Sequence, residues 1–430
     1  MRVHTVRWAV MAMVAALGCG TSSVTSDAGT GAVQEVRSSR ARITATNVPD
    51  DDLATLSAGN RDFGAALYRA VAQSPGNVVM SPHSVSIALG MTWAGARTDT
   101  ETAMAGALRF TMGQARTHAA FNALDQALAS REQQRVESGR TFRLRVANSL
   151  WGQRGTSFLP TFLDTLAERY GAGMNLVDFV RDTEAARVAI NGWVAQRTEQ
   201  RIPELLARGV LNADTRLVLT NAVYFNASWL HRFDAANTRP EAFTRLDGST
   251  VSPPTMRRSV RTNYAEGDGW QAVELPYVGD QVSMLLILPA PGRFAEIEAA
   301  MDGARLGTIA GAVRDHDVNL TLPRFSFRTA VSLRQQLTAL GMGVAFTDAA
   351  DLSAITGVRN LLIQDVVHQG FIAVDENGTE AAAATAVVVG VVSVPPPATF
   401  HANRPFLFAI RDRPTGAVVF LGRVVDPTAM

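Results

Sequence analysis

The stretch from Asp375 to Val389 constrains this chain more than any other segment. It reads DENGTEAAAATAVVV, so a glycine and a run of tiny residues stand directly before a run of valines. Four consecutive alanines favour a helix, whereas Gly378, the flanking threonines and the valines favour an extended chain. A segment suited to two conformations indicates a part of the protein that changes conformation.

As a strand, this segment would present only small side chains on one of its faces. Side chains alternate between the two faces of a strand, so Glu380 would point toward water while its neighbours on either side point the other way. The residues on that second face are small enough to enter a packed sheet: Thr379, Ala381, Ala383 and Thr385.

Composition excludes several classes of function. Of the 430 residues, 47% are hydrophobic and 18% are charged, as expected of a globular protein with a large core. The formal net charge of +1 provides no strong field, so we expect no nucleic-acid partner. All 40 basic residues are arginine, which excludes a phosphate-loop lysine and a Schiff-base lysine.

The N-terminus resembles a bacterial lipoprotein signal. Arg2 and Arg7 precede the apolar run Trp8–Leu17, which is too short for a permanent membrane span, and Cys19 follows it. We therefore predict a signal peptide at residues 1–18, lipidation of Cys19 and an exported protein anchored at the outer membrane, on its periplasmic or cell-surface face. The alternative is an ordinary secretory signal and a secreted protein. Cys19 is the only cysteine, so the exported part has no internal disulfide.

The rest of the chain divides into a tether and a domain. Residues 19–49 are rich in Ser, Thr, Ala and Gly and lack periodic apolar positions, which predicts a flexible tether. Residues 50–430 are predicted to form one α+β domain, because helical patterns dominate early and strand patterns late. The patterns predict helices at 63–71, 85–96, 101–108, 184–199 and 331–340, and strands at 142–151, 217–225, 281–289, 318–327, 406–410 and 417–424.

Motifs for catalysis and for cofactors are missing from the sequence. It contains no G-x-S-x-G, H-E-x-x-H, phosphate-loop or G-x-G-x-x-G pattern, and the seven histidines lack metal-ligand spacing. We predict no metal, no cofactor and no enzymatic activity; a hydrolase triad without a recognisable motif is the alternative. Five arginines between residues 131 and 145 form either a polyanion patch or a solvated basic face.

Several motifs, taken in order, resemble those of the serpin family. The residues Ser81-Pro82-His83-Ser84 resemble the early Ser-Pro-x-Ser motif of that family, and Leu219–Phe225 with Trp229 resembles its central strand and the following turn. The order and spacing of the motifs from about residue 63 to residue 427 identify the chain as a member. Further matches are Val273–Tyr277, Leu322–Phe325, His368 upstream of Glu376, and His401–Phe408.

The resemblance implies a fold and a mechanism. The fold would contain about nine helices, three β-sheets and an exposed reactive loop beside a large sheet, in a monomer. A target protease would attack the loop as a substrate and become acylated. The cut loop would then insert as a new strand in the large sheet and distort the protease, a combination of strand addition and strain release. The expected function is thus suicide-substrate inhibition of a serine endopeptidase; a non-inhibitory serpin that acts as a surface binding or structural protein is the alternative.

The family's spacing from the hinge places the scissile bond at Val392–Ser393, within one residue. Thr379 to Val392 is fourteen residues, which as a strand would span roughly 45 Å at about 3.3 Å per residue. Valine at the cleavage position suits the small apolar pocket of an elastase-like protease; a subtilisin-like or a cysteine protease is the alternative target. The resemblance assigns the hinge to Glu376, Gly378, Thr379, Glu380, Ala381, Ala382, Ala383, Ala384 and Thr385.

The resemblance also assigns a buried polar cluster that controls the opening of the large sheet. Buried polar groups that are merely satisfied, without such a role, are the alternative. Trp229 is expected to pack near the point of insertion. The buried polar cluster comprises Ser81, Ser84, Asn221 and His368.

Three positions depart from the family pattern: Thr98 and Ala227 replace glycines, and Gln200-Arg201 replaces Gly-Lys.

Overall fold

The computed structural model describes residues 33–45, 47–132, 140–379 and 396–429. This part of the chain contains ten α-helices and three β-sheets, which confirms the predicted α+β class. No helix among the described residues is both long and apolar enough to cross a membrane. The helices are α1 (Asp50–Val71), α2 (Pro82–Trp93), α3 (Thr98–Leu108), α4 (Gln114–Ser130), α5 (Pro160–Thr165), α6 (Thr183–Arg197), α7 (Phe294–Ala299), α8 (Gly303–Ala312), α9 (Arg334–Leu337) and α10 (Ser353–Thr356).

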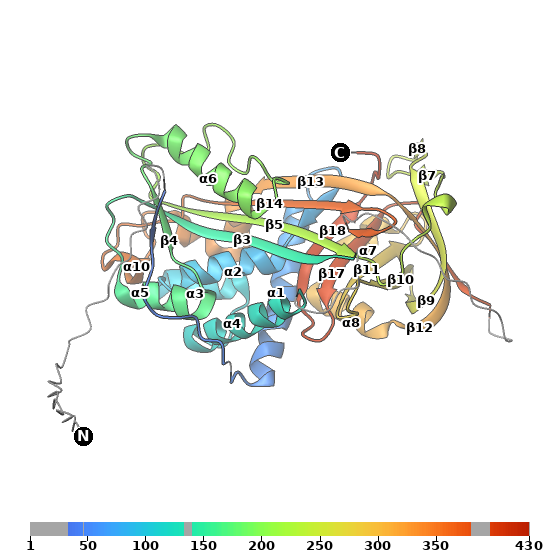
Figure 1. The fold of residues 1–430 in the computed structure, drawn as a ribbon, viewed down its shortest axis with the longest axis horizontal. Helices are drawn as coiled ribbons and strands as arrows, with labels where there is room; N and C mark the ends of the chain where they lie inside the picture. The colour runs from blue at the N-terminus through green and yellow to red at the C-terminus, as the bar shows by residue number, and fades with distance from the viewer. Residues whose placement is uncertain (1–32, 46, 133–139, 380–395, 430) are drawn as a thin grey trace, which may run out of the picture.

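A seven-stranded sheet runs along the molecule in the order β1-β4-β3-β5-β15-β14-β13. Helix α6 covers one face of it and α2 lies against the other (Figure 1). Strand β5 is accordingly a nearly continuous buried run, LVLTNAVYFNAS, as expected of a strand that is covered on both faces. The strands are β1 (Gln34–Val36), β3 (Phe142–Gln153), β4 (Met174–Val177), β5 (Leu217–Ser228), β13 (Phe325–Ser332), β14 (Asp365–Val374) and β15 (Gly378–Thr379).

A second, nine-stranded sheet packs at one end of the first, and two short strands form a separate hairpin. The nine strands are β2 (Val78–Met80), β6 (Arg239–Pro240), β9 (Pro254–Gly267), β10 (Trp270–Pro276), β11 (Val282–Pro289), β12 (Arg314–Pro323), β16 (Ala398–His401), β17 (Phe406–Asp412) and β18 (Val418–Val424), and the hairpin pairs β7 (Phe243–Thr244) with β8 (Thr250–Val251).

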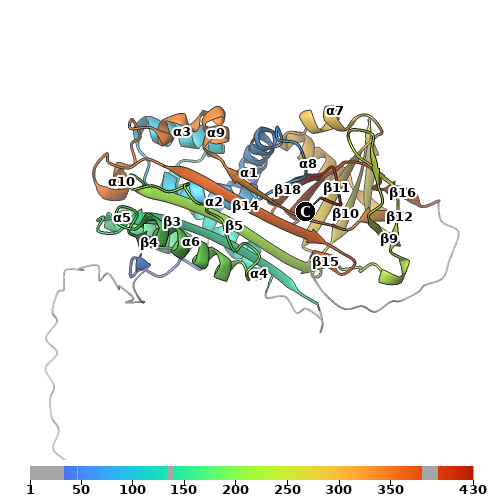
Figure 2. The ribbon, with the colours of Figure 1, turned by 90° about the horizontal axis from the view of Figure 1, so that it is seen from above.

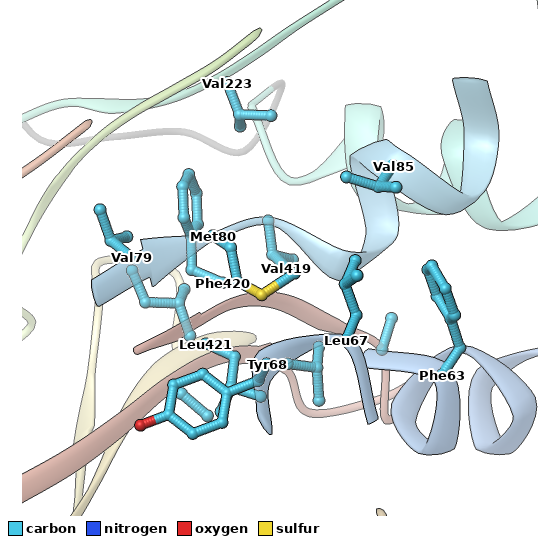
Figure 3. Close-up of a cluster of buried hydrophobic side chains, with 14 of the residues drawn as sticks. Phe63, Leu67, Tyr68, Val79, Met80, Val85, Val223, Val419, Phe420 and Leu421 are labelled. Carbon is cyan, nitrogen blue, oxygen red and sulfur yellow. The ribbon is translucent and has the colours of Figure 1, made fainter. Parts of the chain in front are cut away.

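The main core joins the first helices to both large sheets. Phe63 and Leu67, one helical turn apart on α1, are fully buried and point from α1 into the cluster formed with α2 and β18 (Figure 3), so the helical spacing in the sequence marks a face that packs inward. Side chains from five elements meet in this cluster: Phe63, Leu67 and Tyr68 of α1, Val79 and Met80 of β2, Val85 of α2, Val223 of β5, and Val419, Phe420 and Leu421 of β18.

Two sequence predictions of secondary structure are wrong. The predicted strand at 318–327 is two strands in different sheets, because the chain leaves β12 at Pro323 and enters the large sheet as β13 at Phe325. The predicted helix at 331–340 begins later, since Val331 still pairs with His368 in the sheet. Regular α-helix there ends at Leu337, and Gly341 adopts a φ of +105°.

Part of the range 19–49 that was predicted as a tether is folded onto the domain. Strand β1 pairs antiparallel with β4 at the edge of the large sheet, and Arg37 donates a hydrogen bond of 2.8 Å to the Gly171 carbonyl. Arg42 forms an ion pair of 2.6 Å with Asp125 of α4. The segment from Gln34 to Arg42 is therefore part of the domain, because its arginines and backbone bind the surface beside it.

Two of the departures from the family pattern, Thr98 and Gln200, have local explanations. Thr98 adopts a φ of +52°, which is unfavourable for a residue with a Cβ, but its hydroxyl donates a 3.0 Å hydrogen bond to buried Asp351. Gln200 has a φ of +64° and its N–H bonds to the Ala195 carbonyl at 2.8 Å, which closes the end of α6. Side-chain and backbone hydrogen bonds thus hold two positions where glycine would be unstrained.

Candidate functional site

Strands β5 and β14 pair directly at one end and are separated at the other. Residues Asp365–Gly370 pair in parallel with Val218–Val223. Beyond them the short strand β15 lies between the two strands, and Thr379 pairs antiparallel with Val374 on one side and Ala227 on the other. Figure 2 shows β5 and β14 side by side with β15 at their diverging end. The sheet therefore accepts an antiparallel strand between two parallel neighbours.

A tight turn leads from β14 into this position. The Asp375 carboxylate accepts hydrogen bonds from the backbone N–H of Asn377 at 2.8 Å and of Gly378 at 3.3 Å. A Cβ atom on Gly378 would lie 2.1 Å from the carbonyl oxygen of Ala227. Only glycine allows so close an approach to the neighbouring strand, which explains this residue of the predicted hinge.

Thr379 and Trp229 both contact Tyr277 at the end of the sheet where β5 and β14 are separated. The Thr379 side chain is fully buried, and its hydroxyl is 2.7 Å from the Tyr277 hydroxyl. Burial raises the pKa of Tyr277, so the phenol remains protonated. The ring of Tyr277 stacks on Trp229 with centroids 4.6 Å apart, and the Trp229 indole N–H donates to the Asp375 carbonyl at 3.0 Å. Trp229 thus contacts the turn that leads into β15, beside a tyrosine that the sequence motifs did not connect to the hinge, and its role in insertion remains a prediction.

Glu376 is buried and held by a basic partner. Arg324 Nη2 lies 2.5 Å from Glu376 Oε1, and the Thr238 hydroxyl donates to the same oxygen. Burial raises the pKa of Glu376, but the hydrogen bonds from Arg324 and Thr238 outweigh it, and the net pKa is lowered. The carboxylate is therefore ionised at neutral pH and fastens the start of the hinge to the junction of β12 and β13.

The four predicted gating residues lie in one hydrogen-bonded network. His368 Nε2 accepts from the Ser81 backbone N–H at 3.1 Å, which leaves Nδ1 to donate to the Asn221 side-chain oxygen. Asn221 Nδ2 donates to Ser84 Oγ at 2.5 Å, and Ser84 Oγ donates to Asn148 Oδ1 at 2.7 Å. The network joins α2 to β3, β5 and β14. Asn148 was not predicted, and the gating role of the cluster remains a prediction.

The Ser-Pro-x-Ser motif explains how α2 presents this network. Ser81 is the N-cap residue of α2, and its hydroxyl accepts from the Ser84 N–H at 3.3 Å. Pro82 occupies the first helical turn, where its missing N–H costs nothing. The two serines therefore serve both the start of the helix and the polar contact with the sheet.

Comparison with known proteins decides the family. A family model described as serpin (serine protease inhibitor) matches residues 58–427. The chain is a serpin. It is 37% identical over 383 residues to the leukocyte elastase inhibitor of Sus scrofa, covering 86% of this chain and 99% of that protein. It is 40% identical over 368 residues to an uncharacterised serpin-like protein of Thermococcus kodakarensis, covering 85% and 84%.

The fold agrees with solved serpins. The crystal structure of tengpin, a thermophilic serpin, in its native state matches with a TM-score of 0.79 and 27% identity, covering 90% of this chain and 97% of that one. The predicted serpin fold is confirmed. Serpins are protease inhibitors rather than catalytic enzymes, so membership of the family also confirms that this serpin is not an enzyme.

Part of the predicted site lies outside the described residues. This holds for the predicted reactive bond and for Cys19. Within the described part of the chain, no group of three or more His, Cys, Asp or Glu side chains is arranged to hold a metal ion. The hinge residues outside the described part are Glu380, Ala381, Ala382, Ala383, Ala384 and Thr385, and the reactive bond is Val392–Ser393.

The basic cluster near residues 131–145 is largely paired. Arg145 contacts Glu132 at 2.5 Å and Arg143 contacts Glu199 at 3.0 Å. Arg131 forms a 2.8 Å ion pair with fully buried Asp412. These carboxylates offset the charge of the arginines, which favours the solvated face over the polyanion patch.

The buried His368 predicts a pH dependence of stability. Burial lowers its pKa from 6.5 to about 4, so the unfolded chain binds a proton at a higher pH than the folded chain does. Above pH 6.5 the histidine is neutral in both states and does not lower the free energy of unfolding. As the pH falls from 6.5 toward 4, the free energy of unfolding decreases by on the order of 3 kcal/mol. In urea unfolding at pH 7.5 and 4.5, we expect His368→Gln to show a smaller loss of unfolding free energy than the parent. Equal losses in the two proteins would contradict this.

Proposed function

We propose that this serpin is a suicide-substrate inhibitor of an elastase-like serine protease, which acts by cleavage of the reactive loop and its insertion into the large sheet. The position of Thr379 carries the proposal. This residue is fully buried between β5 and β14 and antiparallel to both. A chain that continued in the direction of Thr379 would enter the seam between β5 and β14.

The residues after Thr379 suit such an insertion. In an extended chain, Ala381 and Ala383 would share the inward face with Thr379. Neither carries charge or bulk, and an unpaired charge buried at these positions would cost several kcal/mol. Insertion can then compete with hydrolysis of the acyl bond, which the inhibitory mechanism requires.

The class of target follows from the predicted cleavage residue and from the relatives. Val392 would enter a small apolar pocket, and the Sus scrofa relative is named a leukocyte elastase inhibitor. Apolar pockets discriminate by only about 1–3 kcal/mol per methylene, so subtilisin is included as a second arm of the test. A non-inhibitory serpin is the alternative function.

The test is a covalent complex with elastase. The full-length serpin is mixed with active elastase, and denaturing electrophoresis should show a complex that survives boiling in detergent. Elastase whose active-site serine has been blocked is the matched control and should give none. Mass spectrometry of the released peptide should place the cut at Val392–Ser393. Cleaved serpin without any complex, with both elastase and subtilisin, would contradict inhibition of small-pocket serine proteases.

We further propose that the serpin acts as a monomer outside the cytoplasm, anchored by a lipid on Cys19. The position of this single cysteine after the apolar leader supports the anchor. Expression of Cys19→Ser should move the protein from the membrane fraction to the soluble fraction. An unchanged distribution would leave secretion or another anchor as the explanation.

A further inference from the structure

We propose that a groove on the side of the second sheet binds a small amphiphilic carboxylate, whose charged group contacts Arg404 and whose hydrocarbon body lies on apolar side chains. The groove has a volume of about 460 Å³, within the range typical of ligand sites. It lies between the β7–β8 hairpin, the connection from β11 to α7, and the segment from β16 to β17. Its walls include Leu246, Pro289, Pro291, Phe294 and Arg404.

Arg404 is a half-buried cation that has no acidic partner in the part of the chain that the structure describes. Its Nε donates to the Pro289 carbonyl at 2.7 Å and its Nη1 to the Asn403 side-chain oxygen at 3.0 Å, both neutral acceptors. Nη2 makes no hydrogen bond or ion pair with any residue that the structure describes. Burial lowers the pKa of Arg404, yet a guanidinium keeps its charge in proteins. A carboxylate on Nη2 would therefore offset a desolvated charge.

The charges around the groove select an anion. No aspartate or glutamate among the described residues lines it, and its second arginine, Arg245, already contacts Asp426 at 2.7 Å. A neighbouring groove of about 480 Å³ shares Arg404 but is lined by Glu266, which would repel a carboxylate. The ligand is therefore assigned to the groove on the Leu246 side.

The apolar side chains that line the groove indicate that the ligand also has a hydrocarbon body. The Leu246 side chain is 58% exposed, and it is one of four large hydrophobic residues so exposed among those that the structure describes. Phe294 and two prolines line the same groove. Covering such surface with hydrocarbon is favourable in proportion to the apolar area removed from water. The combination selects a carboxylate with an alkyl or aromatic body over a free inorganic anion.

Decanoate is a suitable probe for isothermal titration of the full-length serpin. We expect saturable binding of decanoate, and at least tenfold weaker binding of decanol, which has the same alkyl chain without the charge. Acetate, which has the charge without the chain, should also bind at least tenfold more weakly. Equal affinity for decanoate and decanol, or no binding of decanoate, would overturn the proposal.

Two variants locate the site. Leu246→Glu places a carboxylate on the exposed wall of the groove and should weaken decanoate binding at least tenfold. The matched control is Val358→Glu, at a residue 56% exposed on a different loop, which should bind as the parent does. Arg404→Gln tests the cation directly, and circular dichroism checks its folding. Unchanged binding by folded Leu246→Glu or Arg404→Gln would show that decanoate binds elsewhere.

Discussion

Replacing Thr379 with arginine is expected to turn the inhibitor into a substrate. Thr379 is fully buried between β5 and β14, and its hydroxyl contacts the buried Tyr277 hydroxyl at 2.7 Å. The polar partner of Thr379 is the neutral Tyr277 hydroxyl, so a guanidinium at this position would be buried against an uncharged group or would keep the chain out of the sheet. A penalty of about 3 kcal/mol on insertion slows it roughly 100-fold. Hydrolysis of the acyl bond would then be faster.

Denaturing electrophoresis with elastase measures this outcome. Thr379→Arg should give cleaved serpin and free active protease, with the ratio of stable complex to cleaved serpin reduced about 100-fold. Thr379→Val is the matched control: it keeps the shape of the side chain and removes only the hydroxyl, so most of the complex should remain. Undiminished complex formation by Thr379→Arg would show that inhibition does not need insertion at this position.

Cleavage of the reactive loop is expected to raise the melting temperature of the serpin. In the intact serpin, β5 and β14 pair directly in parallel over Asp365–Gly370. A strand inserted between them would pair antiparallel with both neighbours, as Thr379 already does. If each of about ten new backbone hydrogen bonds adds roughly 1 kcal/mol, the gain is on the order of 10 kcal/mol. For a domain of this size that corresponds to a rise of about 10 °C or more.

Scanning calorimetry before and after limited proteolysis tests the expected rise. The protease must cut within the loop, and mass spectrometry should confirm a single cut between Thr379 and Pro396. Cleaved Thr379→Arg is the control and should gain much less. A cleaved parent that melts no higher than the intact protein would favour the non-inhibitory alternative, in which the serpin acts as a binding or structural surface.

The gating cluster shows how much of a buried polar network can be predicted from sequence motifs. Ser81, Ser84, Asn221 and His368 were predicted together from their resemblance to a family, and the structure brings them into one network. Asn148 belongs to the same network but lies in a strand pattern without a recognised motif. Its neighbours across the sheet could have revealed it, since β3 pairs with β5 and places Asn148 opposite Asn221.

Arg324 and Tyr277 illustrate what the sequence pattern leaves open. Both belong to motifs that were recognised, yet neither was connected to the hinge. Arg324 is 52 positions from Glu376, and Tyr277 is 102 positions from Thr379. Local periodicity contains no information on partners so far apart, because long-range pairing depends on how whole strands align.

The sequence alone determined the chemistry of the hinge: a glycine followed by small residues that a packed sheet can accept, within an α+β chain without catalytic motifs. These properties depend on side-chain size, charge and local alternation, which are visible without a fold. Only the tertiary structure decided that β5 and β14 are the strands between which Thr379 lies, and that residues 34–42 belong to the domain. Such contacts join distant segments, and their free energy depends on the packing of the complete sheets.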